Sequence, residues 1–322
     1  MSTVIVVDSG ANHTRARLWD REQVVATAVE PVGSRHTAMD GHNEKLKAAV
    51  QQVIASVIAQ TGLTPEAVVC AGMITANVGL LEVPHVAAPA GPEDLARRIV
   101  RHDFPELSSL PFYFIPGIKS VPTELNAQTL GETDILRGEE AEAAGMRELL
   151  GLTGPVLLMH YRTHHKAIAV NAEGQILYSR TSITGEVLQA VVDNTVIRSS
   201  VLGLDQVEPD ESMWRAGFEQ ARATSFGRAL FLTRVAEQIW KRSKAEATGF
   251  LLGVLMSLDL PLLEGARESG ATVLVYGQGH FPKMLKTYLD GEGWPDVRLL
   301  DEATTQSASA VGAVRIYERM AG

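Results

Sequence analysis

The first residues whose types and spacing suit chemistry are Asp8, Ser9, Gly10, Ala11 and Asn12, which end a run of β-branched residues. A carboxylate at Asp8 could hold the water shell of Mg²⁺, which prefers a few carboxylates together with phosphate oxygens. Gly10 lets backbone N–H groups approach an anion, and Ser9 and Asn12 offer uncharged donors around it. The turn therefore suits a phosphate group, although a strand followed by Asp-x-Gly also occurs in ordinary hairpins, and that alternative stays open.

A second group of charged residues surrounds Gly138. It consists of Asp134, Arg137, Glu139 and Glu140, just before an alanine-rich helix-forming run. A guanidinium recognises carboxylates, and a positioned carboxylate can take the proton of a hydroxyl, so this group could bind and activate a hydroxylated acid. The helix dipole also favours carboxylates in a first turn, so N-terminal capping is the alternative for Glu139 and Glu140.

Two polar turns in the second half of the chain are further candidates. One spans residues 160–166, and the other, Gly277-Gln278-Gly279, ends an apolar run where a helix begins, which is a place where phosphates bind. His160, His164 and His165 could bind a transition metal. Because no cysteine lies near them, a role in the turn or on a phosphate is favoured.

The elements that must position these residues occur in two similar series. The first comprises a three-strand meander over 4–29, a helix over 44–61, a strand over 68–74, a short helix over 92–102, a strand over 112–115 and a helix over 141–150. A second meander is predicted over 156–179. This repetition predicts two lobes, residues 1–150 and 151–322.

The second half is predicted to be rich in helices. They cover residues 185–200 after a Thr184 N-cap, 211–223, 226–240, 244–258, 280–289 and 304–320, with strands at 272–276 and 297–300. The C-terminal helices could support a homodimer.

Composition narrows the class of protein. The net charge of -9 is spread along the chain without basic clusters, so nucleic acid is not expected as a partner. The single cysteine, Cys70, lies in a predicted buried strand, excludes an intrachain disulfide and fits a reducing compartment. We find no leader-like N-terminus and no apolar run that approaches membrane-spanning length, so we expect a cytoplasmic protein that works away from membranes.

Five segments together resemble the 2-dehydro-3-deoxygalactonokinase family, which shares the actin-like ATPase fold. The segments are Asp8–Asn12 with Arg15, Ala71–Ile74, Ile115–Gly117 with Leu136–Glu140, Thr163–Lys166, and Ile183–Glu186. They occur in family order across most of the chain, and the Arg-Gly-Glu-Glu and Thr-His-x-Lys blocks are the specific ones. The resemblance implies an α/β fold of two duplicated lobes of the actin-like ATPase (ribonuclease H-like) type, with an ATP cleft between them.

The resemblance also implies a reaction and its nucleotide site. The family transfers the γ-phosphate of ATP to the primary hydroxyl of 2-keto-3-deoxygalactonate, a reaction that needs positioned phosphates and Mg²⁺. By position, the resemblance makes Asp8–Asn12 the first phosphate hairpin, with Asp8 also a metal ligand, and Gly277–Gly279 the adenosine region. The second phosphate hairpin would contain Thr163, His164 and Lys166.

For the sugar acid, the resemblance points to the group around Gly138. Arg137, Glu139 and Glu140 would face this substrate. By analogy with actin-like kinases, Glu139 is the favoured base for the hydroxyl, with Asp8, Asp134 and Glu140 as alternatives.

Three segments depart from the family pattern. Arg162 stands where the family usually has glycine, and its side chain would either block a phosphate or clamp it bidentately. The segment 75–80 lacks the usual Gly-Ser and Gly-Trp features, and Gly277-Gln278-Gly279-His280 replaces a Gly-Thr/Ser pairing. Two other functions therefore stay open: a sugar-acid sensor of the same fold with impaired catalysis, and a kinase for a different sugar acid.

Overall fold

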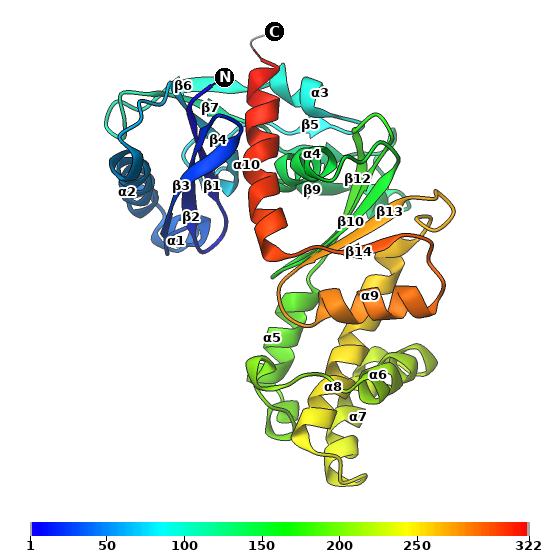
Figure 1. Cartoon of the computed structure of the whole chain (residues 1–322). Helices are drawn as coiled ribbons and strands as arrows, with labels where there is room; N and C mark the ends of the chain where they lie inside the picture. The colour runs from blue at the N-terminus through cyan, green and yellow to red at the C-terminus, as the bar shows by residue number, and fades with distance from the viewer. Residues whose placement is uncertain (1, 321–322) are drawn as a thin grey trace. The chain divides into compact units, whose positions relative to one another are not determined.

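The structure is a computed structural model that describes residues 2–320 (Figure 1). The chain divides into two compact units, which comprise residues 2–154, 170–179 and 301–320 in the first and residues 155–169 and 180–300 in the second. These units differ from the predicted halves, 1–150 and 151–322, because two later segments belong to the first unit.

The C-terminal helix belongs to the first unit because it packs along another helix of that unit. α10 (Glu302–Glu318) runs beside α4 (Glu139–Leu149) (Figure 1). A Cβ atom added to Gly145 of α4 would lie 1.9 Å from the Ala308 carbonyl oxygen of α10, so only glycine permits this approach. Such a contact between distant segments has no signature in local sequence periodicity.

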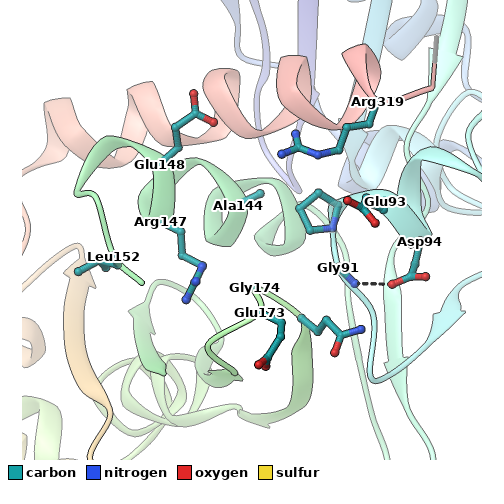
Figure 2. Close-up of a pocket in the computed structure, with 12 residues that line it drawn as sticks. Gly91, Glu93, Asp94, Ala144, Arg147, Glu148, Leu152, Glu173, Gly174 and Arg319 are labelled. Carbon is teal, nitrogen blue, oxygen red and sulfur yellow. Dashed lines mark hydrogen bonds between the residues drawn. The ribbon is translucent and has the colours of Figure 1, made fainter. Parts of the chain in front are cut away.

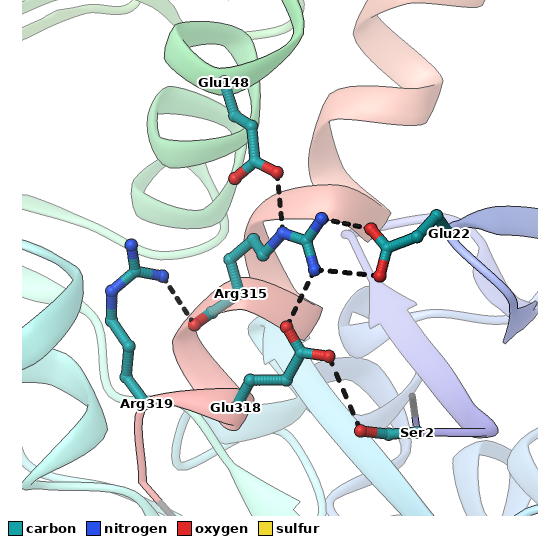
Figure 3. A network of polar contacts seen from close by, with 6 residues as sticks. All are labelled: Ser2, Glu22, Glu148, Arg315, Glu318 and Arg319. Atoms are coloured by element: carbon teal, nitrogen blue, oxygen red, sulfur yellow. Dashed lines mark hydrogen bonds and ion pairs between the residues drawn. The ribbon is translucent and has the colours of Figure 1, made fainter. Parts of the chain in front are cut away.

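An ion-pair network adds a second connection between these helices. Figure 3 shows Arg315 of α10 contacting Glu22, Glu148 and Glu318. The guanidinium lies 2.6 Å from a Glu148 oxygen and 2.8 Å from a Glu318 oxygen, and hydrogen bonding to Glu22 first, and then to Glu148 and Glu318, raises the pKa of Arg315. Because Glu22 lies in the turn after β2, the network connects the meander, α4 and α10 within the first unit.

The first unit contains the predicted meander in a six-stranded sheet of order β3-β2-β1-β4-β7-β6. The strands are β1 (Val4–Ser9), β2 (Thr14–Asp20), β3 (Gln23–Glu30), β4 (Ala67–Gly72), β6 (Val100–Asp103) and β7 (Pro111–Phe114). β4 runs parallel to β1 and to β7. Residues 100–102, predicted as the end of the helix over 92–102, belong instead to the edge strand β6, and the helix there, α3, is only Pro92–Ala96.

Helices and a small sheet complete this unit. α2 (Glu44–Thr61), which matches the predicted helix, buries an apolar stripe against β2 and β3, and α1 (Ser34–Asp40) precedes it. β5 (Val86–Ala87), β8 (Ile118–Ser120) and β9 (Asp134–Leu136) form a second sheet, followed by α4. Cys70 is fully buried in β4, as predicted, and burial raises the pKa of its thiol.

The second meander belongs to a five-stranded sheet of order β12-β11-β10-β13-β14. Its strands are β10 (Val156–Tyr161), β11 (His165–Val170), β12 (Ile176–Ser182), β13 (Thr272–Gly277) and β14 (Val297–Leu299). β13 runs parallel to both β10 and β14. In each sheet, three consecutive strands are neighbours, and the first of them also pairs in parallel with a strand from later in the chain: β4 beside β1, and β13 beside β10. The predicted repetition is therefore confirmed.

The helices of the second unit follow the predicted order with different boundaries. They are α5 (Thr184–Asn194), α6 (Glu211–Ala223), α7 (Phe226–Gln238), α8 (Lys244–Met256) and α9 (Phe281–Gly291), with short 3₁₀ turns between several of them. The N-cap of α5 is Ile183, so Thr184 is the first residue of the helix, and its hydroxyl donates to Asp259 instead of capping. The predicted helix over 185–200 ends at Asn194 and continues as a 3₁₀ turn.

One apolar stretch in this unit corrects an expectation. Lys244–Leu263, which covers α8 and the 3₁₀ turn η5 (Ser257–Leu263), is long and apolar enough to cross a membrane by length and composition alone. We had expected no run of that length. Of its most apolar window, 67% is buried inside the protein, and α8 packs against α6 and α7. Packing inside the protein accounts for its apolar composition.

Candidate functional site

The first predicted phosphate turn connects β1 to β2. Gly10, Ala11 and Asn12 are exposed at its tip. Ser9 is buried, and its hydroxyl lies 3.1 Å from that of Thr14. The polar side chain of Ser9 therefore fixes the base of the turn, while the exposed surface comes from residues 10–12.

Asp8 lies near the end of β1, between its antiparallel neighbour β2 and its parallel neighbour β4, and two glycines bring α4 close to it. A Cβ atom on Gly72 would lie 3.0 Å from Asp8 Oδ1, and one on Gly138 would lie 3.3 Å from Gly72 Cα. Both glycines have positive φ, at +82° and +101°, which side chains rarely adopt. The end of β1, the end of β4 and the start of α4 are therefore close together, and the two acidic groups identified from the sequence lie near one another.

Two carboxylates at the start of α4 differ in environment. Glu140 is 2% exposed, and its two oxygens accept from the Gly138 N–H at 2.9 and 2.8 Å. Burial raises the pKa of Glu140 to about 8, and the negative charge of Glu139 adds to the rise. Glu139 is partly exposed and accepts from the Arg137 N–H at 3.0 Å. Both side chains thus accept from backbone N–H groups just before the first residue of α4, and only Glu139 is accessible.

The Arg137 guanidinium is braced by neutral groups of the same unit. It donates to the Thr75 hydroxyl and to the Val83 carbonyl, each at 2.6 Å, and its Nη2 lies 3.4 Å from His85 Nδ1. Burial and the positive charges of Arg137 and Lys119 lower the pKa of His85 to about 4, so the imidazole is neutral at pH 7. These contacts fix the position of the Arg137 side chain, and because the partners are neutral they leave its positive charge unpaired by them.

Sequence reasoning did not identify the partners of Arg137. Thr75 belongs to the segment 75–80 that departs from the family pattern, whereas Val83 and His85 carried no recognisable signal. Thr75 and Arg137 are 62 residues apart in the chain, so only the tertiary fold reveals the contact. Asp134, the remaining acidic candidate, starts β9 and is partly buried there.

The second predicted phosphate turn connects β10 to β11, and the start of α5 packs against it. A Cβ atom on Gly185 would lie 2.5 Å from the Thr163 carbonyl oxygen and 2.7 Å from that of Arg162, so glycine is required for this approach. Arg162, Thr163 and His164 are exposed, and His164 Nε2 lies 2.6 Å from a carboxylate oxygen of Glu186 on α5.

Arg162 causes no backbone strain in this turn. Among residues 2–320, the non-glycine residues with positive φ are Arg21, Glu22 and Lys241, so Arg162 does not occupy a conformation that favours glycine. Its side chain is exposed and has no hydrogen-bond or ion-pair partner within the described part of the chain. The geometry therefore favours an outward guanidinium over one packed into the turn.

The predicted adenosine region lies beside this turn. Tyr161 and Gly277 are paired at the carboxyl ends of the parallel strands β10 and β13, and the Gln278 N–H donates to the Tyr161 carbonyl at 2.8 Å. Gln278 and Gly279 are exposed. Thr163, His164, Gly277, Gln278 and Gly279 are thus gathered at one end of the sheet, and Lys166 follows on β11.

A buried polar network beneath the second turn was not predicted. His165 Nδ1 lies 2.7 Å from Asp259 Oδ2, and the Thr184 hydroxyl donates to Asp259 Oδ1 at 2.7 Å. The only signal in the sequence is that Asp259 interrupts an apolar stretch. In the described part of the chain, no group of three or more His, Cys, Asp or Glu residues could hold a metal ion, and the three histidines of this region have different neighbours.

A cavity in the first unit lies apart from these residues. It has a volume of about 400 Å³ and is lined by α3, the later part of α4, the turn 173–175 and Arg319 (Figure 2). Arg147 points into it, but its guanidinium already donates to the carbonyls of Gly154, Asn171 and Ala172. None of the predicted site residues lines this cavity.

Comparisons with known proteins agree on one family. The model of the family described as 2-keto-3-deoxy-galactonokinase matches residues 8–312. The chain is 26% identical over 259 residues to the 2-dehydro-3-deoxygalactonokinase of Escherichia coli strain K12, which covers 80% of this chain and 78% of that protein.

Solved structures of other proteins have a fold similar to that of this chain. One, from Sinorhizobium meliloti and assigned as a 2-dehydro-3-deoxygalactonokinase, is 21% identical with a TM-score of 0.76 and covers 97% of each chain. Another, the activator of the 2-hydroxyisocaproyl-CoA dehydratase from Clostridium difficile with bound ADPNP, is 12% identical with a TM-score of 0.51 over 99% of this chain and 96% of that one. The predicted α/β fold of the actin-like ATPase type is confirmed.

Proposed function

Because the chain belongs to the 2-keto-3-deoxy-galactonokinase family and is a carbohydrate kinase, we propose that it transfers the γ-phosphate of ATP to the primary hydroxyl of 2-dehydro-3-deoxy-D-galactonate. The observation that carries the proposal is the contact series from Asp8 through Gly72 to Gly138, which joins the first phosphate turn to the carboxylates of α4. The names of the relatives support the sugar acid, and the ADPNP bound by a protein of similar fold supports ATP.

We assign the role of base to Glu139. Glu140 keeps its proton at neutral pH because its pKa is about 8, and at 2% exposure it does not reach a substrate. Glu139 starts the same helix and is partly exposed. A carboxylate there can accept the proton of the hydroxyl while the oxygen attacks phosphorus.

We assign the carboxylate of the sugar acid to Arg137. A guanidinium has five N–H donors, and the bonds to Thr75 and Val83 leave others for a ligand. These Arg137 N–H groups donate to neutral acceptors and not to a carboxylate. The positive charge of the guanidinium can therefore still attract the carboxylate of a ligand. The neutral His85 imidazole beside it adds no competing charge.

The residues also fit Mg²⁺ and the phosphates of ATP. The partly exposed Asp8 carboxylate offers the hard oxygen that Mg²⁺ prefers, and the exposed turn 10–12 follows it directly. When bound, Mg²⁺ would neutralise charge on the phosphates. In the second unit, Thr163, His164 and Lys166 would hold phosphate, the outward Arg162 would clamp it, and Gly277, Gln278 and Gly279 would lie against the adenosine.

Turnover with a panel of sugar acids tests the proposal. Formation of ADP would be followed with Mg²⁺·ATP and either 2-dehydro-3-deoxy-D-galactonate, its gluconate epimer or D-galactonate. We expect the highest kcat/KM with the first. A higher value with another acid would reassign the substrate, and Mg²⁺·ATP binding without turnover on any acid would favour the sensor.

A further inference from the structure

A buried acid that the proposed chemistry does not use lies beneath the second phosphate turn. Asp259 is 1% exposed on η5, and both of its carboxylate oxygens are engaged, one by His165 and the other by Thr184. A buried carboxylate is costly unless donors satisfy it. The donors here come from two elements that are far from Asp259 in sequence.

The directions of these hydrogen bonds follow from the groups involved. A carboxylate oxygen only accepts, so the Thr184 hydroxyl donates to Asp259 and the His165 proton lies on Nδ1. Because the Thr184 hydroxyl donates to Asp259, it accepts from the Ser182 hydroxyl at 2.6 Å. The Ser182 hydroxyl therefore donates to Thr184, and the Thr184 hydroxyl donates to Asp259.

Each partner of Asp259 fixes one side of the phosphate turn. His165 is the residue directly after the exposed turn, and its ring contacts Tyr161 and Phe281, with centroid distances of 4.6 and 5.0 Å. Tyr161 precedes the turn, and Phe281 is the first residue of α9, just after the predicted adenosine region. One side of the network therefore holds both ends of the hairpin and the start of α9.

Thr184 fixes the other side. The next residue, Gly185, is the one whose backbone approaches the carbonyls of Arg162 and Thr163. A shift of Thr184 would therefore move the α5 backbone relative to those carbonyls. The charge of Asp259 is also felt nearby: burial raises the pKa of Tyr161 well above its usual range, and Asp259 adds to the rise.

We propose that Asp259 is a positioning residue for nucleotide binding, which acts through His165 and Thr184 to hold the turn 162–164 in the geometry that receives phosphate. The inference rests on the proposed use of ATP and extends it to residues that touch no substrate. A preorganised turn lowers the ordering cost that phosphate binding would otherwise meet.

The test compares two ligands that share the nucleoside and differ in the Mg²⁺-bound diphosphate. Mg²⁺·ADP and adenosine would each be titrated calorimetrically into wild type, Thr184→Val and Asp259→Asn, and thermal unfolding would be measured for each protein. We expect both variants to bind Mg²⁺·ADP about tenfold more weakly. Adenosine affinity should stay within about twofold of wild type, because the network positions the phosphate turn rather than the nucleoside.

Two further variants separate positioning from loss of structure. Thr184→Ser retains the hydroxyl and should restore Mg²⁺·ADP affinity. Thr233→Val is the matched control, because Thr233 is also fully buried in the second unit and its hydroxyl has no hydrogen-bond partner among residues 2–320. This control should bind both ligands as wild type does.

Three outcomes would overturn the inference. Unchanged Mg²⁺·ADP affinity in Thr184→Val and Asp259→Asn would remove it while leaving the proposed function in place. Equal losses for Mg²⁺·ADP and adenosine would mean a general structural role. Failure of wild type to bind Mg²⁺·ADP would overturn the proposed use of ATP itself, and the inference with it.

Discussion

The two turns that the repeated meander provides each connect neighbouring strands of a sheet, but different side chains surround them. The turn after β1 ends beside Asp8, is backed by the α4 carboxylates, and rests on the neutral pair Ser9 and Thr14. The turn after β10 exposes Arg162 and His164 and rests on the ionisable pair His165 and Asp259. The same strand–turn–strand scaffold thus places Asp8 and the α4 carboxylates at the turn in one copy and an exposed Arg162 guanidinium at the turn in the other.

This difference suggests that the copies have divided the work of phosphoryl transfer. Acid–base chemistry and a hard cation need carboxylates, whereas triphosphate needs cations and backbone donors. Variants in the first turn should therefore alter turnover and the dependence on Mg²⁺, and variants in the second should alter nucleotide affinity.

The largest expected effect is on the proposed base. Glu139→Gln should lower kcat by about 10²- to 10⁴-fold, because the amide cannot take the proton of the hydroxyl. Mg²⁺·ADP affinity should stay within about twofold. Glu142→Gln, in the same first turn of α4, is the control for the lost helix-terminal charge. Turnover in Glu139→Gln equal to that of Glu142→Gln would move the base elsewhere.

Substitution of Arg137 should act on the sugar acid. Arg137→Lys replaces a planar fork by a point charge, so KM for the sugar acid should rise about tenfold or more while KM for ATP changes little. Arg147→Lys is a matched control, since Arg147 also donates to neutral carbonyls of the first unit but lies outside the site. If both variants lose stability alike and neither changes KM, then Arg137 is only a structural brace.

The buried Glu140 should make stability depend on pH. Its carboxyl has a usual pKa of 4.5 and titrates at about 8 in the folded chain, so between these values the native state holds a proton that the unfolded chain has released. The contribution of Glu140 to the free energy of unfolding is therefore fully present below about pH 4.5 and is lost as the pH rises toward 8. The loss in unfolding free energy should approach about 1.4 kcal/mol per pH unit.

Glu140→Gln should remove this dependence, because the amide is isosteric with the protonated acid and its oxygen can still accept from Gly138. Urea unfolding of wild type and Glu140→Gln at pH 5, 6, 7 and 8 measures it. The variant should gain relative to wild type as pH rises. Parallel curves for the two proteins would show that Glu140 does not titrate in this window.

The smallest expected effect concerns the second turn. Arg162→Ala should weaken Mg²⁺·ATP binding by about two- to tenfold if the exposed guanidinium clamps phosphate, since a charge-assisted contact at the surface is of modest strength. Arg228→Ala removes another exposed cation of the same unit as a control. Tighter binding by Arg162→Ala would mean instead that the arginine obstructs the nucleotide.

Local patterns were sufficient to predict much of the fold. Alternating apolar residues defined the meander over 4–29, three- and four-residue spacing defined α2, and their repetition predicted the second sheet. The edge strand at 100–103 was missed, because its residues are exposed and carry no alternation of apolar and polar types. The placement of α10 was missed because it depends on a close contact with α4 at Gly145.

The candidate site was predictable to the extent that its residues are neighbours in the chain. Asp8–Asn12 and Arg137–Glu140 were found as short motifs with suitable chemistry. Their contact through Gly72 joins segments that are far apart in sequence, and the partnership of His165 with Asp259 spans 94 residues. Composition and spacing carry no information about such pairs, so the network beneath the second turn emerged only from the structure.

The division of work is tested most directly by the Mg²⁺ dependence of ADP binding. ADP would be titrated into wild type, Asp8→Asn and Arg162→Ala, each with Mg²⁺ and with the metal chelated. We predict that Asp8→Asn abolishes the gain in affinity that Mg²⁺ gives wild type, whereas Arg162→Ala weakens binding by the same factor in both conditions. An unchanged Mg²⁺ effect in Asp8→Asn, or its loss in Arg162→Ala, would contradict the assignment of carboxylate chemistry to the first turn and phosphate binding to the second.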